Sequence, residues 1–425
     1  MLHPPVDLAV IGAGTAGAAA AAFLAERGLK VVVLERRTLA AAGARWVNGV
    51  PRGVFRAAGV AVPTGDEDLG GPHPFHMIAP GGRVRIDDHD VIDVDMRALV
   101  ARLQARAMAA GVTFLPGVAA LGRDRDLLRT SGGPIRCRWI VDASGLGGAG
   151  LLPVPDVAPH HLCAAAQEIR EVRDAAAARA YFDAHDVGPG EALVEVGVAG
   201  GFSVRNVRLF HGGATVGILT GSIPALGHPP GKVILDRFVA AQPWIGRRVY
   251  GGAGAIPLRR PHDRLADDQV ALLGDAGCQV FPAHGSGIGA GMLAARLLAD
   301  VVADGGSLRD YEVGWQRRHG GLHASFDVVR RWNQGTDAAT LGRIMALGLI
   351  DAEVLRAGLD QAFPRIAPRS LPGKARALIG APSLARGIAT TLARGAAVRA
   401  LYARYPAAAA RVPAWSRRVD WVVGA

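Results

Sequence analysis

The pattern that most restricts the fold lies near the amino terminus, where a glycine-rich turn stands between an apolar strand and a helix. Residues 7–11 are predicted to form the strand, residues 12–17 read Gly-Ala-Gly-Thr-Ala-Gly, and the helix that follows ends at Gly28. A second apolar strand at 30–34 is closed by Glu35. Glycines let backbone amides approach a pyrophosphate, and a helix N-terminus offers partial positive charge. The carboxylate of Glu35, at the end of the second strand, can accept a hydrogen bond from a ribose hydroxyl. Together these features predict a dinucleotide-binding unit.

A second glycine-rich loop, at residues 274–289, leads into a helix expected at 287–303. It reads Gly-Asp-Ala-Gly-Cys-Gln-Val-Phe-Pro-Ala-His-Gly-Ser-Gly-Ile-Gly. Here the sequence resembles FAD-dependent oxidoreductases of the superfamily that holds aromatic-ring hydroxylases, geranylgeranyl reductases and flavin-dependent halogenases. The resemblance implies that Asp275 binds the ribityl hydroxyls and that the amides of 285–288 lie near the flavin pyrimidine edge. A helix N-terminus there would stabilise the negative charge of reduced flavin.

The order of further landmarks also matches that superfamily. The resemblance places Arg45 and Arg97 near the phosphate and ribityl region, Val118 against adenine, and the turn at 142–145 beside the cofactor. The alternatives are salt bridges for the two arginines and a simple strand-end turn for Asp142. The expected cofactor-binding residues are Gly12, Gly14, Thr15, Ala16, Gly17, Glu35, Arg36, Arg45, Arg97, Val118, Asp142, Gly274, Asp275, Pro282, Gly285, Ser286, Gly287 and Ile288.

The spacing of apolar residues changes along the chain and predicts an α/β architecture of three parts. Short alternating runs between 192 and 219 are typical of antiparallel strands, and the chain beyond 306 has a helical period. We expect a Rossmann-like FAD-binding domain of the glutathione-reductase type, an inserted, mainly antiparallel β-sheet substrate domain and a helical, Arg-rich C-terminal extension. Their expected bounds are 1–60, 91–150 and 263–305 for the first, 61–90 and 151–262 for the second, and 306–425 for the third.

Composition excludes several classes of protein. The three cysteines are widely spaced, which excludes a disulfide framework and a zinc ribbon, and the paired histidines lack acidic or cysteine partners at ligand spacing, so we predict no metal site. The sequence contains no run of about 20 strongly apolar residues, so we predict no membrane span. The apolar stretch at 10–25 is interrupted by glycines and follows no basic segment, which argues against a signal peptide and favours a cytoplasmic protein.

Most of the net charge of +11 lies at the carboxyl end of the 425-residue chain. Residues 356–425 hold eleven arginines and one lysine against two aspartates, a net charge of +10. Such helices can pack on the FAD-binding domain with solvated arginines, contact an anionic membrane peripherally, or dock a large acidic substrate. No aromatic platform or nucleic-acid motif accompanies the charge, so we expect no nucleic-acid partner.

The sequence differs from the motifs of the halogenases and of the geranylgeranyl reductases, and these differences indicate which reaction is favoured. Between Lys30 and Lys232 there is no lysine, and the Trp-x-Trp-x-Ile-Pro segment of the halogenases is absent. Residues 201–208 are polar where many geranylgeranyl reductases carry aromatic side chains, which weakens the case for an isoprenoid pocket. The sequence therefore favours an FAD-dependent monooxygenase, a hydroxylase that attacks an electron-rich aromatic group through a flavin C4a-hydroperoxide.

Three functions stay open at this point. The substrate of a monooxygenase could be an aromatic small molecule or a Trp or Tyr side chain of an acidic partner protein, as in flavoproteins of quinone-cofactor maturation. The alternative is a geranylgeranyl-reductase-like enzyme that saturates an isoprenoid double bond at the membrane, and a flavin-bound docking protein without turnover is the third reading. With one dinucleotide fingerprint, electrons are expected from transiently bound NAD(P)H or from a separate reductase or reduced-flavin system.

Several side chains are candidates for chemistry or substrate contact. His284 lies in the loop expected to face the flavin, which makes it the candidate acid or base, although a loop histidine can also merely pack. Arg205, His211 and Arg259 are the candidate substrate contacts in the second domain, and His161 is a further one. The alternative for each is a structural residue with satisfied hydrogen bonds.

Overall fold

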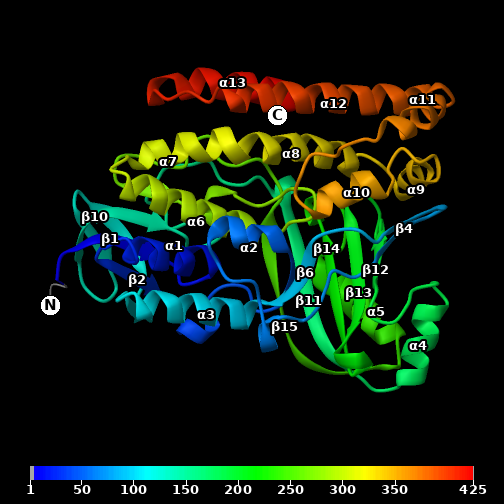
Figure 1. Cartoon of the computed structure of the whole chain (residues 1–425), viewed down its shortest axis with the longest axis horizontal. Helices are drawn as coiled ribbons and strands as arrows, with labels where there is room; N and C mark the ends of the chain where they lie inside the picture. The colour runs from blue at the N-terminus through cyan, green and yellow to red at the C-terminus, as the bar shows by residue number, and fades with distance from the viewer. Residues whose placement is uncertain (1–3, 425) are drawn as a thin grey trace.

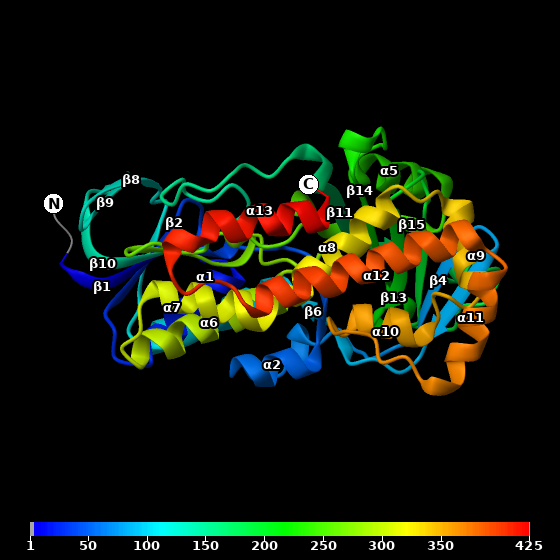
Figure 2. The same ribbon diagram turned by 90° about the horizontal axis from the view of Figure 1, so that it is seen from above.

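The computed structural model describes residues 4–424. These residues form two large sheets, a two-stranded sheet and a set of C-terminal helices (Figure 1). Seen from above, α8, α12 and α13 run from the region of the first sheet to that of the second (Figure 2).

The first large sheet carries the amino-terminal strand at its centre. Its strands are β1 (Val6–Ile11), β2 (Val31–Glu35), β7 (Thr113–Pro116), β8 (Ala120–Asp124), β9 (Leu127–Thr130), β10 (Ile135–Asp142) and β16 (Val270–Leu272). The order is β7-β2-β1-β10, β16 pairs with the end of β10, and the β8–β9 hairpin joins the start of β10. Because the pairs around β1 and β10 are parallel, the carboxyl ends of β1, β2, β10 and β16 lie at one edge of the sheet.

Small residues bring the helices of this domain close together. Helix α1 (Thr15–Ala25) contacts both α3 (Met96–Ala109) and α6 (Ile288–Ala303), and Ala18–Ala22 are fully buried between them. A methyl side chain fills little space, so three helices can pack at short distance over the parallel sheet. The alanine-rich composition of this stretch is thus a requirement of packing.

The second large sheet is antiparallel except where β12 meets β4. Its strands are β4 (Phe75–Ala79), β5 (Gly82–Ile86), β11 (Leu162–Val172), β12 (Ala192–Val196), β13 (Ser203–Phe210), β14 (Thr215–Ser222) and β15 (Ile245–Pro257). Helices α4 (Ala175–Asp183) and α5 (Gly231–Ala241) pack on one face. The small sheet of β3 (Val47–Pro51) and β6 (Val91–Asp95), with α2 (Arg52–Ala58), lies between the two large sheets (Figure 1).

The C-terminal helices stack in layers. Helix α7 (Leu308–Trp315) continues through a π-helical turn, η7 (Gln316–Gly320), into α8 (Gly321–Gln334). Helices α9 (Ala338–Ala346) and α10 (Ala352–Leu359) pack on β4 and β5, and α11 (Leu371–Ile379), α12 (Pro382–Ala403) and α13 (Val412–Val423) form the outer layer (Figure 1). A Cβ on Gly320 would lie 2.5 Å from Tyr402 Cδ1, so a glycine at this position lets α12 lie against the start of α8.

The buried carboxylate of Glu312 ties this region to the first domain. Its Oε2 accepts the backbone amides of Leu265 (2.7 Å) and Ala266 (2.6 Å), and its Oε1 accepts the Tyr405 hydroxyl. Arg260, also buried, donates to Asp420 of α13 at 2.6 Å. Within residues 4–424 no helix is long and apolar enough to cross a membrane.

One predicted boundary is wrong. In the sequence, Met96, Leu99, Val100, Leu103 and Met108 recur at helical spacing and predict a helix over 94–110, but Val94 and Asp95 belong to β6, and α3 begins at Met96. The Asp95 carboxylate accepts the backbone amide of Arg97 at 2.8 Å and caps the helix. Pairing of β6 with β3 takes the two residues into a strand, a long-range contact that local periodicity does not register.

Candidate functional site

The first glycine turn is held by contacts that exclude any side chain. Gly12 has φ +99°, and a Cβ there would lie 2.5 Å from the Ala143 carbonyl oxygen. A Cβ on Gly17 would lie 1.9 Å from the Gly12 carbonyl oxygen, and one on Gly14 would lie 3.1 Å from Gly43 Cα. The turn therefore packs backbone against backbone, with its amides at the N-terminus of α1, as pyrophosphate binding requires.

Glu35 lies at the end of β2 beside this turn and is buried. Its Oε2 accepts the Ala13 amide at 3.1 Å and its Oε1 accepts the Arg37 amide at 2.9 Å. These bonds fix the carboxylate at the sheet edge where a ribose would lie. Arg36, next to it, is exposed, and Thr15 begins α1 as a buried residue.

The second loop reaches the same edge because α6 packs on α1. Cβ atoms placed on Gly274 and Gly291 would lie 3.2 and 3.1 Å from Ala16 Cβ, so the two helices approach through small residues. The loop begins with η6 (Gly274–Gly277) directly after β16, and α6 starts at Ile288. The glycine turn and the flavin loop are thus neighbours in space although about 260 positions separate them in sequence.

Two polar groups of this loop have no partner among the described residues. Asp275 makes no side-chain hydrogen bond there, and burial raises its pKa to about 6. Its Oδ1 lies 3.1 Å from where a Cβ of Gly287 would stand. The Ser286 hydroxyl is buried and also lacks a partner. A cofactor with several hydroxyl groups would satisfy both, so the residues present fit the ribityl chain of FAD.

The remaining expected cofactor residues lie at or near the site with varied contacts. Arg45 is exposed and donates to the Ala40 carbonyl, whereas Arg97 is held by Asp95 at 2.5 Å and by the Tyr250 ring at 3.5 Å. Val118 donates its amide to the Glu35 carbonyl at 3.1 Å, next to the turn. Pro282 is buried in the flavin loop.

The Asp142 carboxylate stabilises the turn that follows β10. Its Oδ1 accepts the Ser144 amide at 3.1 Å and the Ser144 hydroxyl at 2.6 Å, and its Oδ2 accepts the Ala149 amide at 2.6 Å. With its oxygens engaged and the residue buried, the carboxylate shapes the turn against which Gly12 packs. The expectation that it also contacts the cofactor stays a prediction.

An apolar wall faces the flavin loop from the second sheet. Cβ atoms on Gly285 would lie 3.3 Å from Leu258 Cδ2 and 3.4 Å from Ile256 Cγ2. These two residues form a cluster with Cys163, Ala165, Phe202 and Ile223. Trp46 adjoins the same strand, since its ring lies 3.5 and 3.6 Å from Cβ positions on Gly252 and Gly254. The wall holds no charged side chain, and burial raises the pKa of the Cys163 thiol to about 12.

His284 lies where the C-terminal helices approach the flavin loop. Its ring is 5.0 Å from that of Phe281, which in turn is 4.6 Å from Phe326 of α8. The residue is exposed to solvent. The protein atoms packed around its imidazole lower its pKa to about 4, while a backbone hydrogen bond with Gly358 acts in the opposite direction. At neutral pH the group is an uncharged imidazole that can accept a proton.

The expected substrate contacts do not gather at this wall. Arg205 points to the opposite face of the sheet, where it pairs with Glu195 at 2.5 Å and stacks on Phe238 of α5. His211 is exposed in a turn beyond β13. The expectation that these two residues contact substrate beside the flavin is not supported, because strand alternation and the hairpin turn them away.

Arg259 and His161 lie nearer the loop. Arg259 follows β15, and its charge contributes to lowering the pKa of His262 to about 4, after burial, the larger cause. His161 accepts from Arg330 at 2.9 Å, and burial lowers its pKa to about 3. His161 is therefore engaged in a buried network, and a substrate role for Arg259 stays a prediction.

Sequence reasoning missed three features that shape the site. Trp46 directly follows Arg45 and forms part of the wall, yet a lone aromatic residue carries no signal of its own. Gln167 holds the backbone of Val47 with both amide atoms, at 2.6 and 2.9 Å, and it could have been noticed as a polar residue in an apolar strand. The buried Asp327–Arg330 pair of α8 resembles any exposed helix pair in sequence.

Comparisons with known proteins agree with this geometry. The profile of the family described as FAD dependent oxidoreductase matches residues 7–65. Digeranylgeranylglycerophospholipid reductase 1 of Methanopyrus kandleri is 24% identical over 343 residues, which are 74% of this chain and 84% of that protein.

Solved structures share the fold at low identity. A geranylgeranyl bacteriochlorophyll reductase-like protein of Thermoplasma acidophilum matches with a TM-score of 0.70 and 17% identity over 92% of this chain and 100% of that one. PqsL of Pseudomonas aeruginosa, whose structure is titled a probable FAD-dependent monooxygenase, matches with a TM-score of 0.56 and 18% identity over 84% of this chain and 99% of that one. Reductases and monooxygenases thus share this arrangement.

Proposed function

We propose that this chain, an FAD-dependent oxidoreductase, saturates carbon–carbon double bonds of a prenyl chain carried by a membrane lipid. The observation that carries the proposal is the apolar surface beside the flavin loop, where the partly buried side chains of Trp46, Phe202 and Ile256 lie next to the buried cluster of Ala165, Ile223 and Leu258. A hydrocarbon chain needs such a surface, because an uncharged wall without unpaired polar groups binds it by excluding water. The similarity to digeranylgeranylglycerophospholipid reductase over most of both chains supports the same class of substrate.

The polar residues at 201–208 do not oppose a prenyl substrate in this fold. Arg205 lies on the far face of the sheet with Glu195, and Phe202 and Val204 pack on the near side. Arg208 is neutralised by the buried Asp93, to which it donates. Alternation along β13 places Phe202 and Val204 on the near face together with Asn206 and the neutralised Arg208, and the apolar pair lies at the end of the strand next to the flavin loop.

The side chains of the site have distinct tasks in such a reaction. Bound and reduced FAD supplies a hydride equivalent, and a proton from solvent completes the addition of two hydrogens across the double bond. The wall orients the alkene and excludes water, and Trp46 closes it on the side of Gly252 and Gly254. His284 is neutral at pH 7 and open to solvent, so its ring nitrogens can relay a proton between water and the site.

The outer helices fit a substrate that resides in a membrane. Leu371, Ile379, Leu392 and Trp421 are exposed on α11–α13, Trp421 by 83% and Ile379 by 82%. Eleven arginines and one lysine lie in the same stretch of chain. Exposed apolar side chains next to arginines are the combination that binds an anionic bilayer surface.

The test is an anaerobic turnover assay. The FAD-loaded protein is reduced with dithionite and incubated with digeranylgeranylglycerophospholipid in micelles, and products are followed by mass spectrometry. We expect a gain of two hydrogens per double bond, lost in a Gly254→Leu variant that fills the wall and kept in Gly254→Ala, whose Cβ would have ordinary contact with Trp46 at 3.6 Å. No gain of hydrogen by a protein that binds FAD normally would overturn the proposal.

A second function is favoured by a separate observation. The exposed arginines Arg376, Arg386, Arg394 and Arg417 form no ion pair within residues 4–424, so they could receive an acidic protein whose Trp or Tyr is hydroxylated. The same assay in oxygen separates this monooxygenase from the reductase. An oxygen-dependent gain of one oxygen atom on an aromatic group, with no alkene reduction in argon, would favour it.

A further inference from the structure

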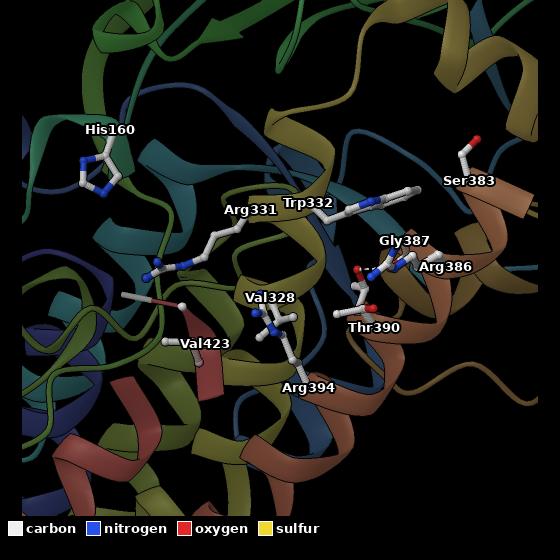
Figure 3. Close-up of a pocket in the computed structure, with 12 residues that line it drawn as sticks. His160, Val328, Arg331, Trp332, Ser383, Arg386, Gly387, Thr390, Arg394 and Val423 are labelled. Carbon is white, nitrogen blue, oxygen red and sulfur yellow. Dashed lines mark hydrogen bonds between the residues drawn. The ribbon is translucent and has the colours of Figure 1, made fainter. Parts of the chain in front are cut away.

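A cavity of about 680 Å³ lies between α8 and α12, apart from the flavin loop (Figure 3). Arg331 and Trp332 of α8 and Arg386, Thr390 and Arg394 of α12 line it. The flavin-side residues of α8 project from its other face, since Phe326 contacts Phe281. This cavity therefore belongs to neither the cofactor site nor the apolar wall.

The cavity is strongly cationic. Its lining includes three arginines and a histidine, His160, and no aspartate or glutamate. Arg331 shares Asp327 with Arg330, and Arg386 and Arg394 form no ion pair within residues 4–424. Arg386 and Arg394 lie eight residues apart on α12, and both side chains line the same groove (Figure 3). Like charges held together in this way favour a bound anion.

The other lining groups suit an anion with an organic part. Ser383 and Thr390 present hydroxyl groups that make no side-chain hydrogen bond in the described chain, and hydroxyls can donate to phosphate oxygens. Trp332 forms a flat wall, and Gly387 leaves it uncovered, because a Cβ there would lie 3.0 Å from the indole Nε1. A cavity of this volume is within the range of small-molecule sites and is larger than a bare phosphate needs.

We propose that the cavity between α8 and α12 binds the phosphate group of an organic phosphate ester. Arg386 and Arg394 hold the phosphate by charge-assisted hydrogen bonds, Thr390 donates to a third oxygen, and the organic part lies along Trp332. The same chemistry is found in a soluble phosphate ester and in a phospholipid headgroup. This proposed phosphate site rests on the residues that line the cavity and does not depend on the reaction catalysed at the flavin.

The test measures binding to the full-length, FAD-loaded protein with two probes. One is sn-glycerol 3-phosphate, followed by calorimetry, and the other is phosphatidylcholine vesicles with added phosphatidic acid, followed by cosedimentation. The cavity variant is Arg386→Ala/Arg394→Ala, and the charge-matched control is Arg376→Ala/Arg411→Ala, two exposed arginines outside the cavity. FAD content and thermal melting report folding in each.

We expect the cavity variant to lose at least about tenfold in affinity, and the control less than about twofold for glycerol 3-phosphate. With vesicles the control should lose several-fold less than the cavity variant, since any removed arginine weakens the general attraction to an anionic bilayer. Thr390→Asp, at an exposed position, places a negative charge in an intact cavity and should weaken binding to a similar extent. Loss with glycerol 3-phosphate identifies a soluble ester site, and loss with vesicles alone identifies a headgroup site. Binding of neither probe, equal loss in the control, or full binding by both cavity variants would overturn the proposal.

Discussion

Removing one partner of the buried Asp327–Arg330 pair should destabilise the protein far more than removing both. The side chains of both residues are fully buried on α8, and Arg330 Nη2 lies 2.5 Å from Asp327 Oδ1. Arg330 also donates to His161 at 2.9 Å, so the pair connects α8 to the second sheet. Burial opposes the charge of Asp327, but Arg330 and Arg331 hold the pKa of its carboxyl below the ordinary value.

The magnitude follows from burial. An Asp327→Leu variant leaves the Arg330 guanidinium without a countercharge and without water, which costs about 3–5 kcal/mol for pairs of this kind. Arg331 contributes little to this loss, because its side chain is 21% exposed and can be hydrated. An Arg330→Met variant leaves the buried carboxylate with the partly exposed Arg331 alone, at 3.3 Å, so it should cost less. The double variant Asp327→Leu/Arg330→Met replaces both charges with apolar groups of similar size, which is often near neutral.

The assay is equilibrium urea unfolding of the four proteins, followed by circular dichroism and by flavin absorbance. The free energies of unfolding then form a double-mutant cycle. We expect Asp327→Leu to lose about 3–5 kcal/mol of a total of about 5–15 kcal/mol, Arg330→Met to lose less than this but more than about 1 kcal/mol, and the double variant to lose much less than the sum. Single losses below about 1 kcal/mol, or simple additivity, would refute the argument that the pair is buried and mutually compensated.

Three further outcomes are expected. Gly17→Ala should abolish FAD binding, seen as loss of the flavin spectrum after purification, because its Cβ would lie 1.9 Å from a backbone oxygen. The control Gly28→Ala, whose Cβ would have no atom within 4 Å, should keep FAD and lower the free energy of unfolding by about 1 kcal/mol, because its φ is +86°. Asp275→Asn should weaken FAD about tenfold in a titration of the apoprotein without lowering the melting temperature, because no side chain in the described chain depends on that carboxylate. Burial lowers the pKa of His161 and of His323 to about 3, below the ordinary 6.5 of the unfolded chain. Between these two pH values the unfolded state therefore binds more protons than the folded state. The free energy of unfolding should fall by up to about 1.4 kcal/mol per group and pH unit as the pH drops from 6.5 toward 3. A flat stability between pH 7 and 4.5 would contradict the burial of both rings.

The parts of the site that follow local rules could be predicted from the sequence. The glycine turn at 12–17 and the acid at Glu35 are set by backbone sterics within one strand–helix–strand unit, and α1 and β2 lie where that pattern places them. Family resemblance added FAD and the second glycine loop. Asp275 and Ser286 lie in that loop with unpaired polar groups, as residues that meet a cofactor would.

Other features depended on distant parts of the chain. Whether Arg205 faces the flavin or the opposite side is set by the pairing register of β13, because one step along a strand reverses the side chain. The polar residues at 201–208 count against a prenyl pocket in the sequence, but in the fold their side chains divide between the two faces of the sheet. The capping of α3 by Asp95 likewise required the pairing of β6 with β3.

The sequence by itself determined the dinucleotide-binding unit and the concentration of charge at the carboxyl end, because these depend on residue type and on spacing within a short segment, and family resemblance added the flavin. The tertiary structure alone decided which side chains share a surface. Only folding brings Trp46 to β15, places Phe281 against α8, and sets Arg386 and Arg394 opposite Arg331 around one cavity. The physical reason is that substrate and ligand contacts are made between elements, and their register and packing are fixed by the whole core.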